Sequence, residues 1–233
     1  MFIKNILYQT SSTDFEFALI IGVALLLIYL AAKVHTSKTR GRDVRERYAM
    51  QQGAAGESAV SSILSRLPKS QYKVINDVLI AKGSNTTQID HVIVSSYGIF
   101  VIETKNYTGC LVGDEFDEHM DYYVGENRLS IYNPLKQNRS HVYSLMNALN
   151  ISFKSSFIPI LALSNNCQFE ITTDTDVVHF SSLFNTILQY RTVVFSKEEM
   201  EEITERIKEL NIVDRKERRR HIERVNAYVQ SVD

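Results

Sequence analysis

The chain has 233 residues, of which 44% are hydrophobic and 23% are charged. This composition supports one packed domain with additional segments, and it excludes wholesale disorder and low-complexity or collagen-like architectures. Because 26 basic residues nearly balance 27 acidic ones, the chain is not a bulk polycation, and any nucleic-acid surface must be a local patch. Two cysteines and no CxxC motif argue against a disulfide framework and a structural zinc site.

One strongly apolar run, residues 15–32, follows a short N-terminal segment of residues 1–14, and Glu16 is its only charged residue. A helix of about 20 apolar residues crosses the hydrocarbon core of a bilayer. The alternative is a cleaved signal peptide, since Lys4 precedes the run and small residues end it. The run is long for a signal sequence, however, and it leads into a basic stretch rather than a polar cleavage region. We therefore predict an uncleaved transmembrane helix over residues 15–32.

Basic residues directly after the apolar run predict its orientation. Residues 33–50 form a basic linker, whereas Lys4 is the only basic residue before the run. The basic residues of the linker are Lys33, Lys38, Arg40, Arg42, Arg45 and Arg47. Because basic flanks stay on the cytoplasmic side, we predict a single-pass protein of the cell membrane with its N-terminus outside and its C-terminal domain in the cytoplasm.

Helical patterns organise the part of the chain after the linker. The first predicted helix has one apolar stripe at positions i, i+3, i+4 and i+7, formed by Val60, Ile63, Leu64 and Leu67. A second helix is expected to begin at Asn133–Pro134, because proline is favoured in a first helical turn. Further helices are expected over residues 181–190 and 197–210 and, with a strongly basic sequence, from residue 214 onward. We assign residues 51–195 to a compact domain and residues 196–233 to a helical tail.

Strand patterns lie between these helices. The predicted strands are residues 73–80, 88–95, 99–105, 157–163 and 177–180, with a short β-meander over residues 109–129. A helix, then strands, then a helix and another strand is typical of an α/β or α+β domain with helices on the faces of its sheet. We therefore predict an α/β fold in the domain that follows the transmembrane helix.

Two carboxylates stand out on the central hairpin. Side chains alternate along a strand, so Asp90 is expected on the face of Val92, and Glu103 on the face of Val101. If Ser95 pairs with Gly98 across the turn, Asp90 lies directly opposite Glu103, with their Cβ atoms about 5 Å apart. A bulged turn at Gly98 would break this register.

Two carboxylates that face each other in a sheet repel, unless a cation or a shared proton compensates. A hard divalent cation such as Mg²⁺, or Mn²⁺ in its place, would compensate, because Mg²⁺ binds through one or two carboxylates and keeps several waters. Lys105 lies two residues beyond Glu103 on the same face. Its ammonium can orient or deprotonate a water, or offset charge that builds on phosphorus. The spacing therefore suits hydrolysis of a phosphodiester bond.

Glu57 is a third acidic candidate. It lies three residues before Val60, on the inward stripe of the first helix. A carboxylate that points to the core requires a metal or a strong donor. The alternative is an acid at the helix N-terminus that only interacts with the helix dipole.

Several segments together resemble the nuclease-related domain, NERD. The segments are Gly56-Glu57, Thr87-Gln88-Ile89-Asp90-His91-Val92-Ile93-Val94, Gly98-Ile99-Phe100-Val101-Ile102-Glu103-Thr104-Lys105-Asn106, Gly109, and Asn133-Pro134-Leu135-Lys136-Gln137-Asn138 with His141 after it. The resemblance runs from about Gly53 to Phe169. It is carried by the joint pattern D-x12-E-x-K plus NPxxQ, since either half alone would be weak.

The resemblance implies membership of the PD-(D/E)xK nuclease superfamily, with a restriction-endonuclease-like αβββαβ core and a mixed central sheet. Carried over residue by residue, Asp90 and Glu103 would be metal ligands with Glu57 as the helix acid, and Lys105 would be the catalytic lysine. Gln137 would match the glutamine on the helix after the catalytic strands. His141 stands where some exonuclease relatives have a tyrosine, and this departure leaves its role open.

Two functions follow from these expectations. The first is a membrane-anchored, Mg²⁺- or Mn²⁺-dependent nuclease that acts in the cytoplasm on nucleic acid, with DNA preferred over RNA as the expected substrate. The alternative is a nuclease-like module that docks nucleic acid or a protein partner at the membrane without cleavage, since a fold alone does not fix function. Lys136 and Arg139 could contact phosphates, although a charged, solvated helix surface is the default interpretation. Three tyrosines could stack on bases, although aromatics at this density are more often core residues: Tyr122, Tyr123 and Tyr132. The basic tail could bind DNA or anionic lipid, or be a solvated helix face.

Overall fold

The computed structural model describes residues 51–152 and 156–232. The predicted N-terminal segment, transmembrane helix and basic linker, residues 1–50, therefore lie outside the described residues. Within the described ranges, no helix is both long and apolar enough to cross a bilayer. The unit described below is Gln52–Asp233.

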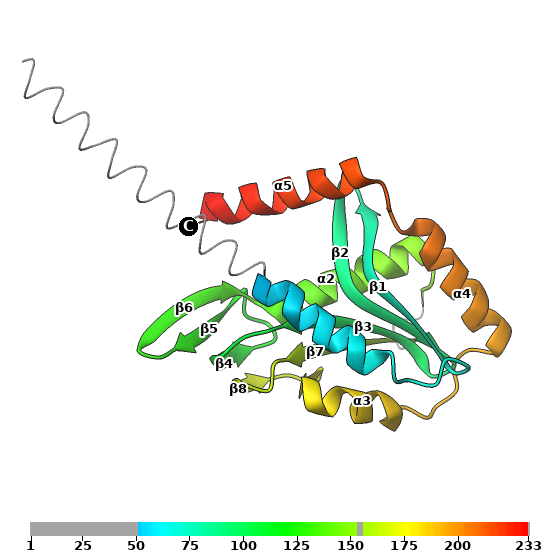
Figure 1. The fold of residues 1–233 in the computed structure, drawn as a ribbon, viewed down its shortest axis with the longest axis horizontal. Coiled ribbons are helices and arrows are strands. Elements are labelled where there is room, and N and C mark those ends of the chain that lie inside the picture. Colours follow the sequence, from blue (N-terminus) through cyan, green and yellow to red (C-terminus); the bar gives the residue numbers. More distant parts are fainter. Residues whose placement is uncertain (1–50, 153–155, 233) are drawn as a thin grey trace, which may run out of the picture. The chain divides into compact units, whose positions relative to one another are not determined.

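A five-stranded mixed sheet forms the centre of this unit (Figure 1). Its strands, in spatial order, are β1 (Tyr72–Lys82), β2 (Asn85–Ser95), β3 (Gly98–Lys105), β7 (Phe157–Leu163) and β9 (Asp176–His179). Strand β2 is antiparallel to both β1 and β3, while β7 is parallel to β3 and β9 is parallel to β7. The prediction of an α/β domain with a mixed central sheet is confirmed.

A second sheet has four strands, three of which lie in the chain between β3 and the helix that follows. Its strands, in spatial order, are β6 (Asn127–Tyr132), β5 (His119–Val124), β4 (Gly109–Asp114) and β8 (Cys167–Thr172). The meander of β4 to β6 was predicted, but β8 was not. Strand β8 pairs in parallel with β4, more than fifty residues earlier in the chain, and local sequence patterns carry no signal for such a pairing.

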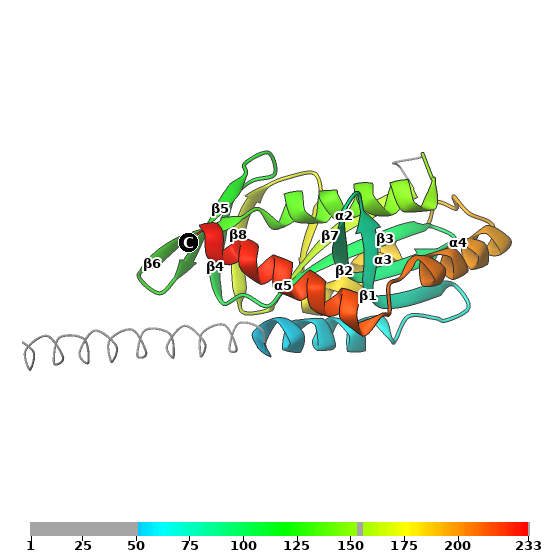
Figure 2. The same ribbon diagram turned by 90° about the horizontal axis from the view of Figure 1, so that it is seen from above.

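Helices cover both faces of the central sheet (Figures 1 and 2). Residues 51–64 and α3 (Phe180–Gln189) pack on one face, where Val60, Leu64 and Leu183 join a core cluster with Phe100 and Ile102. The other face is covered by α2 (Pro134–Leu149) and α4 (Lys197–Leu210), whose buried residues meet β2 and β3. Each fully buried aliphatic side chain contributes about 1.5–3 kcal/mol, so both layers stabilise the sheet that carries the candidate site.

The chain after residue 195 is not a detached tail throughout. Met200 and Ile207 of α4 are buried in the same core cluster as Val92. Helix α5 (Arg215–Val232) is fixed to the β1–β2 hairpin by two arginines. Arg218 Nη1 donates to Asp77 Oδ2 at 2.7 Å, and Arg224 Nη2 donates to Thr86 Oγ1 at 2.8 Å. The boundary predicted at residue 196 stays a prediction, but α4 contributes to the packed core.

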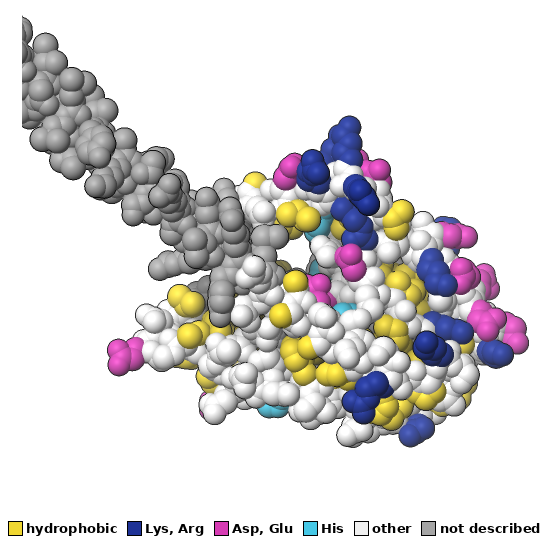
Figure 3. Space-filling model, in the orientation of Figure 1, with side chains coloured by type: hydrophobic (Ala, Val, Ile, Leu, Met, Phe, Trp, Pro, Cys, Tyr) yellow, Lys and Arg dark blue, Asp and Glu magenta, His cyan; other side chains and the backbone are white. Residues whose placement is uncertain are grey.

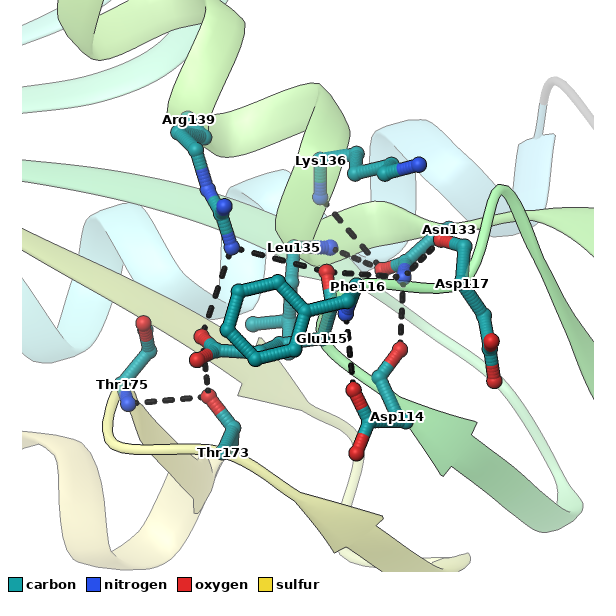
Figure 4. Close-up of polar contacts among 10 residues, drawn as sticks. All are labelled: Asp114, Glu115, Phe116, Asp117, Asn133, Leu135, Lys136, Arg139, Thr173 and Thr175. Atoms are coloured by element: carbon teal, nitrogen blue, oxygen red, sulfur yellow. Dashed lines mark hydrogen bonds and ion pairs between the residues drawn. The ribbon is translucent and has the colours of Figure 1, made fainter.

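Helix α2 begins where the sequence predicts, and Asn133 explains why. The Oδ1 atom of Asn133 accepts the backbone N–H of Leu135 at 2.9 Å, which caps the helix, and Pro134 follows as its first residue. The Nδ2 atom of the same side chain donates to the carbonyl oxygens of Asp114 and Asp117 at 3.0 and 2.7 Å (Figure 4). One amide therefore ties the start of α2 to the loop that follows β4.

Asn138 fixes α2 to the central sheet. Its Nδ2 atom donates to the carbonyl oxygen of Val101 on β3 at 3.0 Å and to that of Ile160 on β7 at 3.1 Å. Because Asn138 lies between Gln137 and His141 on this helix, these two bonds set the depth and rotation of the segment that faces the candidate site.

Candidate active site

The hairpin of β2 and β3 has the predicted register. Ser95 pairs with Gly98, and the ladder continues to the pair of His91 and Ile102. Gly98 has a φ of +139°, a conformation that glycine adopts without strain. The expectation on which the carboxylate pair depends is therefore confirmed up to the residue next to Asp90.

Strand β2 departs from β3 at Asp90. The last ladder pair of the two strands is His91 with Ile102, and the side chain of Asp90 then replaces the ladder, since its Oδ2 accepts the backbone N–H of Thr104 at 2.8 Å. The strand also changes the face that it buries here, because Ile89 lies in the same core cluster as Val92. On the neighbouring strand, Asp77 has a left-handed φ of 56° at the same level. Regular alternation, which the prediction assumed, therefore fails at Asp90.

Glu103 is at the centre of a polar cluster under α2. Its side chain is 1% exposed, and its Oε1 lies 2.7 Å from Nζ of Lys105. Its Oε2 lies 3.2 Å from Nε2 of His141. Lys105 Nζ also donates to Oε1 of Gln137 at 3.1 Å, and Nδ1 of His141 lies 2.9 Å from Oγ1 of Thr87. The structure therefore brings Lys105, Gln137 and His141 together with Glu103.

The pKa values in this cluster show which groups carry charge. Burial alone would raise the pKa of Glu103, but Lys105 and His141 outweigh it and hold that pKa below its ordinary value. Burial likewise would lower the pKa of Lys105, but the Glu103 carboxylate raises it above its ordinary value. Glu103 is therefore a carboxylate and Lys105 an ammonium, held together as a buried ion pair.

The pKa of Asp90 is shifted in the opposite direction from that of Glu103. Burial, followed by repulsion from Glu103, raises its pKa well above its ordinary value, although Lys105 and the Thr104 N–H oppose this. Repulsion between these two carboxylates is the second cause of the shift, after burial. An added cation between the two would remove the cost of ionising Asp90.

Glu57 reaches the same end of β3 from the opposite side of the sheet. Burial first, then repulsion from Asp77 and Glu103, raises its pKa. Its helix approaches β3 closely because Gly56 has no side chain: a Cβ there would lie 2.7 Å from Cβ of Asn106. Within the described ranges, no three His, Cys, Asp or Glu side chains are arranged to hold one metal ion. A role of Glu57 as a third metal ligand stays a prediction.

Two oxygen donors nonetheless fit a hard cation. Oε2 of Glu103 is buried, and within the described part of the chain it has no hydrogen bond of good geometry despite the nearby His141. A buried oxygen whose hydrogen bonding is incomplete can accept a further partner. Asp90 and Glu103 supply the one or two carboxylates through which Mg²⁺ or Mn²⁺ is bound. The residues present therefore fit such an ion.

His91 and His141 have different surroundings. Strand alternation predicts that His91 faces away from Asp90 and makes a structural contact, and it does lie away from the cluster: its Nδ1 bonds Oδ1 of Asn76 at 2.8 Å, and burial lowers its pKa to about 4. His141, whose role was left open, contacts Glu103 directly. Its position four residues after Gln137 was the one available signal, since residues i and i+4 share a helix face. Thr87, which orients His141, gave no such signal.

Residues 52–164 match the family model of NERD, the nuclease-related domain. All five residues singled out from the sequence lie within this NERD match: Glu57, Asp90, Glu103, Lys105 and Gln137. Over 211 residues the chain is 28% identical to the uncharacterized protein pXO1-01 of Bacillus anthracis, and the similarity covers 88% of this chain and 93% of that protein. No solved structure is significantly similar to the chain.

Proposed function

We propose that the chain is a metal-dependent nuclease that hydrolyses phosphodiester bonds, with DNA as the preferred substrate and a restriction-endonuclease-like core. The proposal rests on one observation: the Lys105 ammonium lies beside Glu103, a carboxylate that repels the carboxylate of Asp90. Gln137 accepts a hydrogen bond from the same ammonium. The NERD match is consistent with a nuclease-like function. The order of helix, three strands, helix and strand around the central sheet is also that of the proposed core.

The charge of each side chain determines its proposed role. Asp90 and Glu103 would hold Mg²⁺ or Mn²⁺, with Glu57 as the nearest further carboxylate. When bound, the ion supplies a Lewis acid for the phosphate and an activated water. Lys105 stays protonated beside Glu103, so it acts as a fixed positive charge toward the pentacoordinate phosphorus rather than as a proton acceptor. Gln137 keeps the Lys105 ammonium in place through its bond of 3.1 Å, and His141 orients Glu103 from the other side.

The proposal includes a membrane location. The apolar run of residues 15–32 and the basic linker after it support a single-pass anchor with the nuclease domain in the cytoplasm. A reporter enzyme fused after Asp233 tests this topology, since we expect it to be active only as a cytoplasmic fusion. Extraction of the chain from membranes by carbonate would contradict the anchor.

A specific observation favours the second function, docking without cleavage. Both carboxylate oxygens of Glu103 have basic neighbours, Lys105 at 2.7 Å and His141 at 3.2 Å. An enzyme that binds an ion here must loosen the contact with His141, because that imidazole lies against the oxygen that would face the ion. If the cluster never opens, the fold can still dock nucleic acid.

The test is cleavage of labelled single- and double-stranded DNA and RNA by the full-length chain, with Mg²⁺, with Mn²⁺ and with EDTA. We expect cleavage that needs the ion and is lost in Asp90→Asn. A control is Lys197→Ala at the start of α4, because the N–H of Phe195 ties this part of the chain to Ser96, at the other end of β2 from Asn85. Binding of nucleic acid without any cleavage under all conditions would favour the docking function.

A further inference from the structure

A groove beside the candidate active site is lined by positive charge, which also gathers at the start of α5 (Figure 3). It has a volume of about 690 Å³ and lies between α2 and the end of the β1–β2 hairpin, with Tyr132 of β6 at its border. Its lining includes three cations, Lys82, Lys136 and Arg139, and no acidic residue. In a chain with a net charge of −1, such a local concentration of one sign attracts a polyanion.

The bend of β2 creates this groove. Because β2 leaves β3 at Asp90, the far end of the β1–β2 hairpin rises from the sheet along the side of α2 (Figure 1). Lys82 at that end donates from Nζ to Oγ of Ser140 at 2.5 Å. Ser140 directly precedes His141, and Lys136 directly precedes Gln137. The groove and the polar cluster around Glu103 thus lie on adjacent sides of the same two turns of α2.

The cations differ in how firmly they are already held. Arg139 lies 3.3 Å from Oε2 of Glu115 and above the ring of Phe116, with 5.8 Å from its guanidinium carbon to the ring centre (Figure 4). In contrast, Lys136 makes no ion pair within the described residues, and its ammonium extends away from these contacts (Figure 4). Lys136 is therefore the cation most available to a phosphate.

The border of the groove supplies a surface for bases. Tyr132 is 47% exposed and Tyr143 is 46% exposed, and both line the groove together with Lys136. Single strands bind where cations follow the backbone and aromatic rings stack on bases, and each stacked base adds about 1–3 kcal/mol. A duplex keeps its bases stacked inside and cannot use such rings.

We propose that this groove binds a single-stranded segment of nucleic acid and guides its phosphodiester backbone to Asp90 and Glu103. Lys82 and Lys136 contact successive phosphates, and Tyr132 stacks on a base. This inference rests on the proposed function for its purpose, but binding in the groove does not require cleavage.

The test is fluorescence anisotropy of the full-length chain with labelled 15-mer dT, 15-mer rU and a DNA duplex, at several salt concentrations in EDTA. Lys136→Gln is the main variant because it breaks no ion pair. We expect weaker binding of both single strands, with the slope of log Kd against log salt reduced by about 0.7 for one lost contact. Lys82→Gln should have a similar effect, and Tyr132→Ala should weaken binding about tenfold.

The control is Lys197→Gln, an identical change at an exposed lysine of α4. The start of α4 is tied to Ser96, at the opposite end of β2 from Lys82, because the N–H of Phe195 donates to Ser96. Lys197→Gln should bind like the unchanged chain. Equal binding by Lys136→Gln, Lys82→Gln and the control would overturn the proposal that the groove binds a single strand. A preference for the duplex, or no binding at all, would also overturn it. Binding that depends on the groove, without cleavage in Mg²⁺ or Mn²⁺, would instead overturn the proposed nuclease activity and support the proposed binding groove.

Discussion

The buried imidazole of His91 should make the fold sensitive to mild acid. His91 is 1% exposed, and burial lowers its pKa from 6.5 to about 4. Between these pH values the unfolded chain binds a proton at this residue and the folded chain does not, so stability falls as the pH is lowered through this window. Each pH unit in the window is worth about 1.4 kcal/mol, and the window from 6.5 to about 4 therefore corresponds to about 3 kcal/mol. That is a large part of the 5–15 kcal/mol typical of a domain.

The measurement is the free energy of unfolding in urea of the full-length chain at a series of pH values from 7.5 to 4. His91→Gln cannot bind the proton, and its amide can still donate to Oδ1 of Asn76, so its stability should lose about 3 kcal/mol less than that of the unchanged chain over this range. His119→Gln is the matched control, because His119 is exposed on β5. An identical pH dependence for His91→Gln and the unchanged chain would refute the reasoning.

Three further variants probe the site and its support. Asp90→Asn should raise the urea midpoint in EDTA, since the amide does not repel Glu103 and can still accept the Thr104 N–H. The variant should also abolish any stabilisation by Mg²⁺ or Mn²⁺. A lower midpoint with the ion effect retained would show that the two carboxylates share no site. Lys105→Ala should reduce the rate of single-turnover cleavage by about a hundredfold or more but leave nucleic-acid binding, measured by anisotropy, nearly unchanged. Full cleavage activity would mean that the β2–β3 hairpin has only a structural role. Because the variant leaves Glu103 without its cation, melting curves must show that it is folded. Asn138→Leu should destabilise the fold by about 1–3 kcal/mol in urea, as the carbonyls of Val101 and Ile160 lose a donor, and an unchanged midpoint would refute that role.

The parts of the fold that follow from local rules could be predicted from the sequence. The start of α2 follows from an asparagine cap and a proline, and the turn of the central hairpin follows from Gly98 between two apolar strands. Both depend on residues within a few positions of one another. The α/β class follows from the order of these elements, whereas the mixed strand directions were expected only from the resemblance to NERD.

The parts that the sequence did not reveal depend on distant contacts. Alternation placed Asp90 on a regular strand, but β2 bends there, because the Asp90 carboxylate binds the Thr104 N–H instead of continuing the ladder. Glu57 was expected as a ligand from its helical stripe, yet whether a helix covers one face of a sheet or the other is not encoded in its own periodicity. The contact of His141 with Glu103 likewise needs α2 to lie across β3 at one depth, which Asn138 sets.

The double role of Asn133 determines where this domain can change its length during evolution. Its amide joins the loop after β4 to the first turn of α2, so the inserted sheet and the helix that carries Gln137 move as one piece. An insertion into that loop would pull on the helix and displace Gln137 from Lys105. Among the residues that the structure describes, nothing lies within 4 Å of a Cβ at Gly125 in the β5–β6 turn, and no side chain ties this turn to a helix. Added residues should therefore be tolerated at this turn, which makes it the natural place to attach a label or a further domain without disturbing the chemistry.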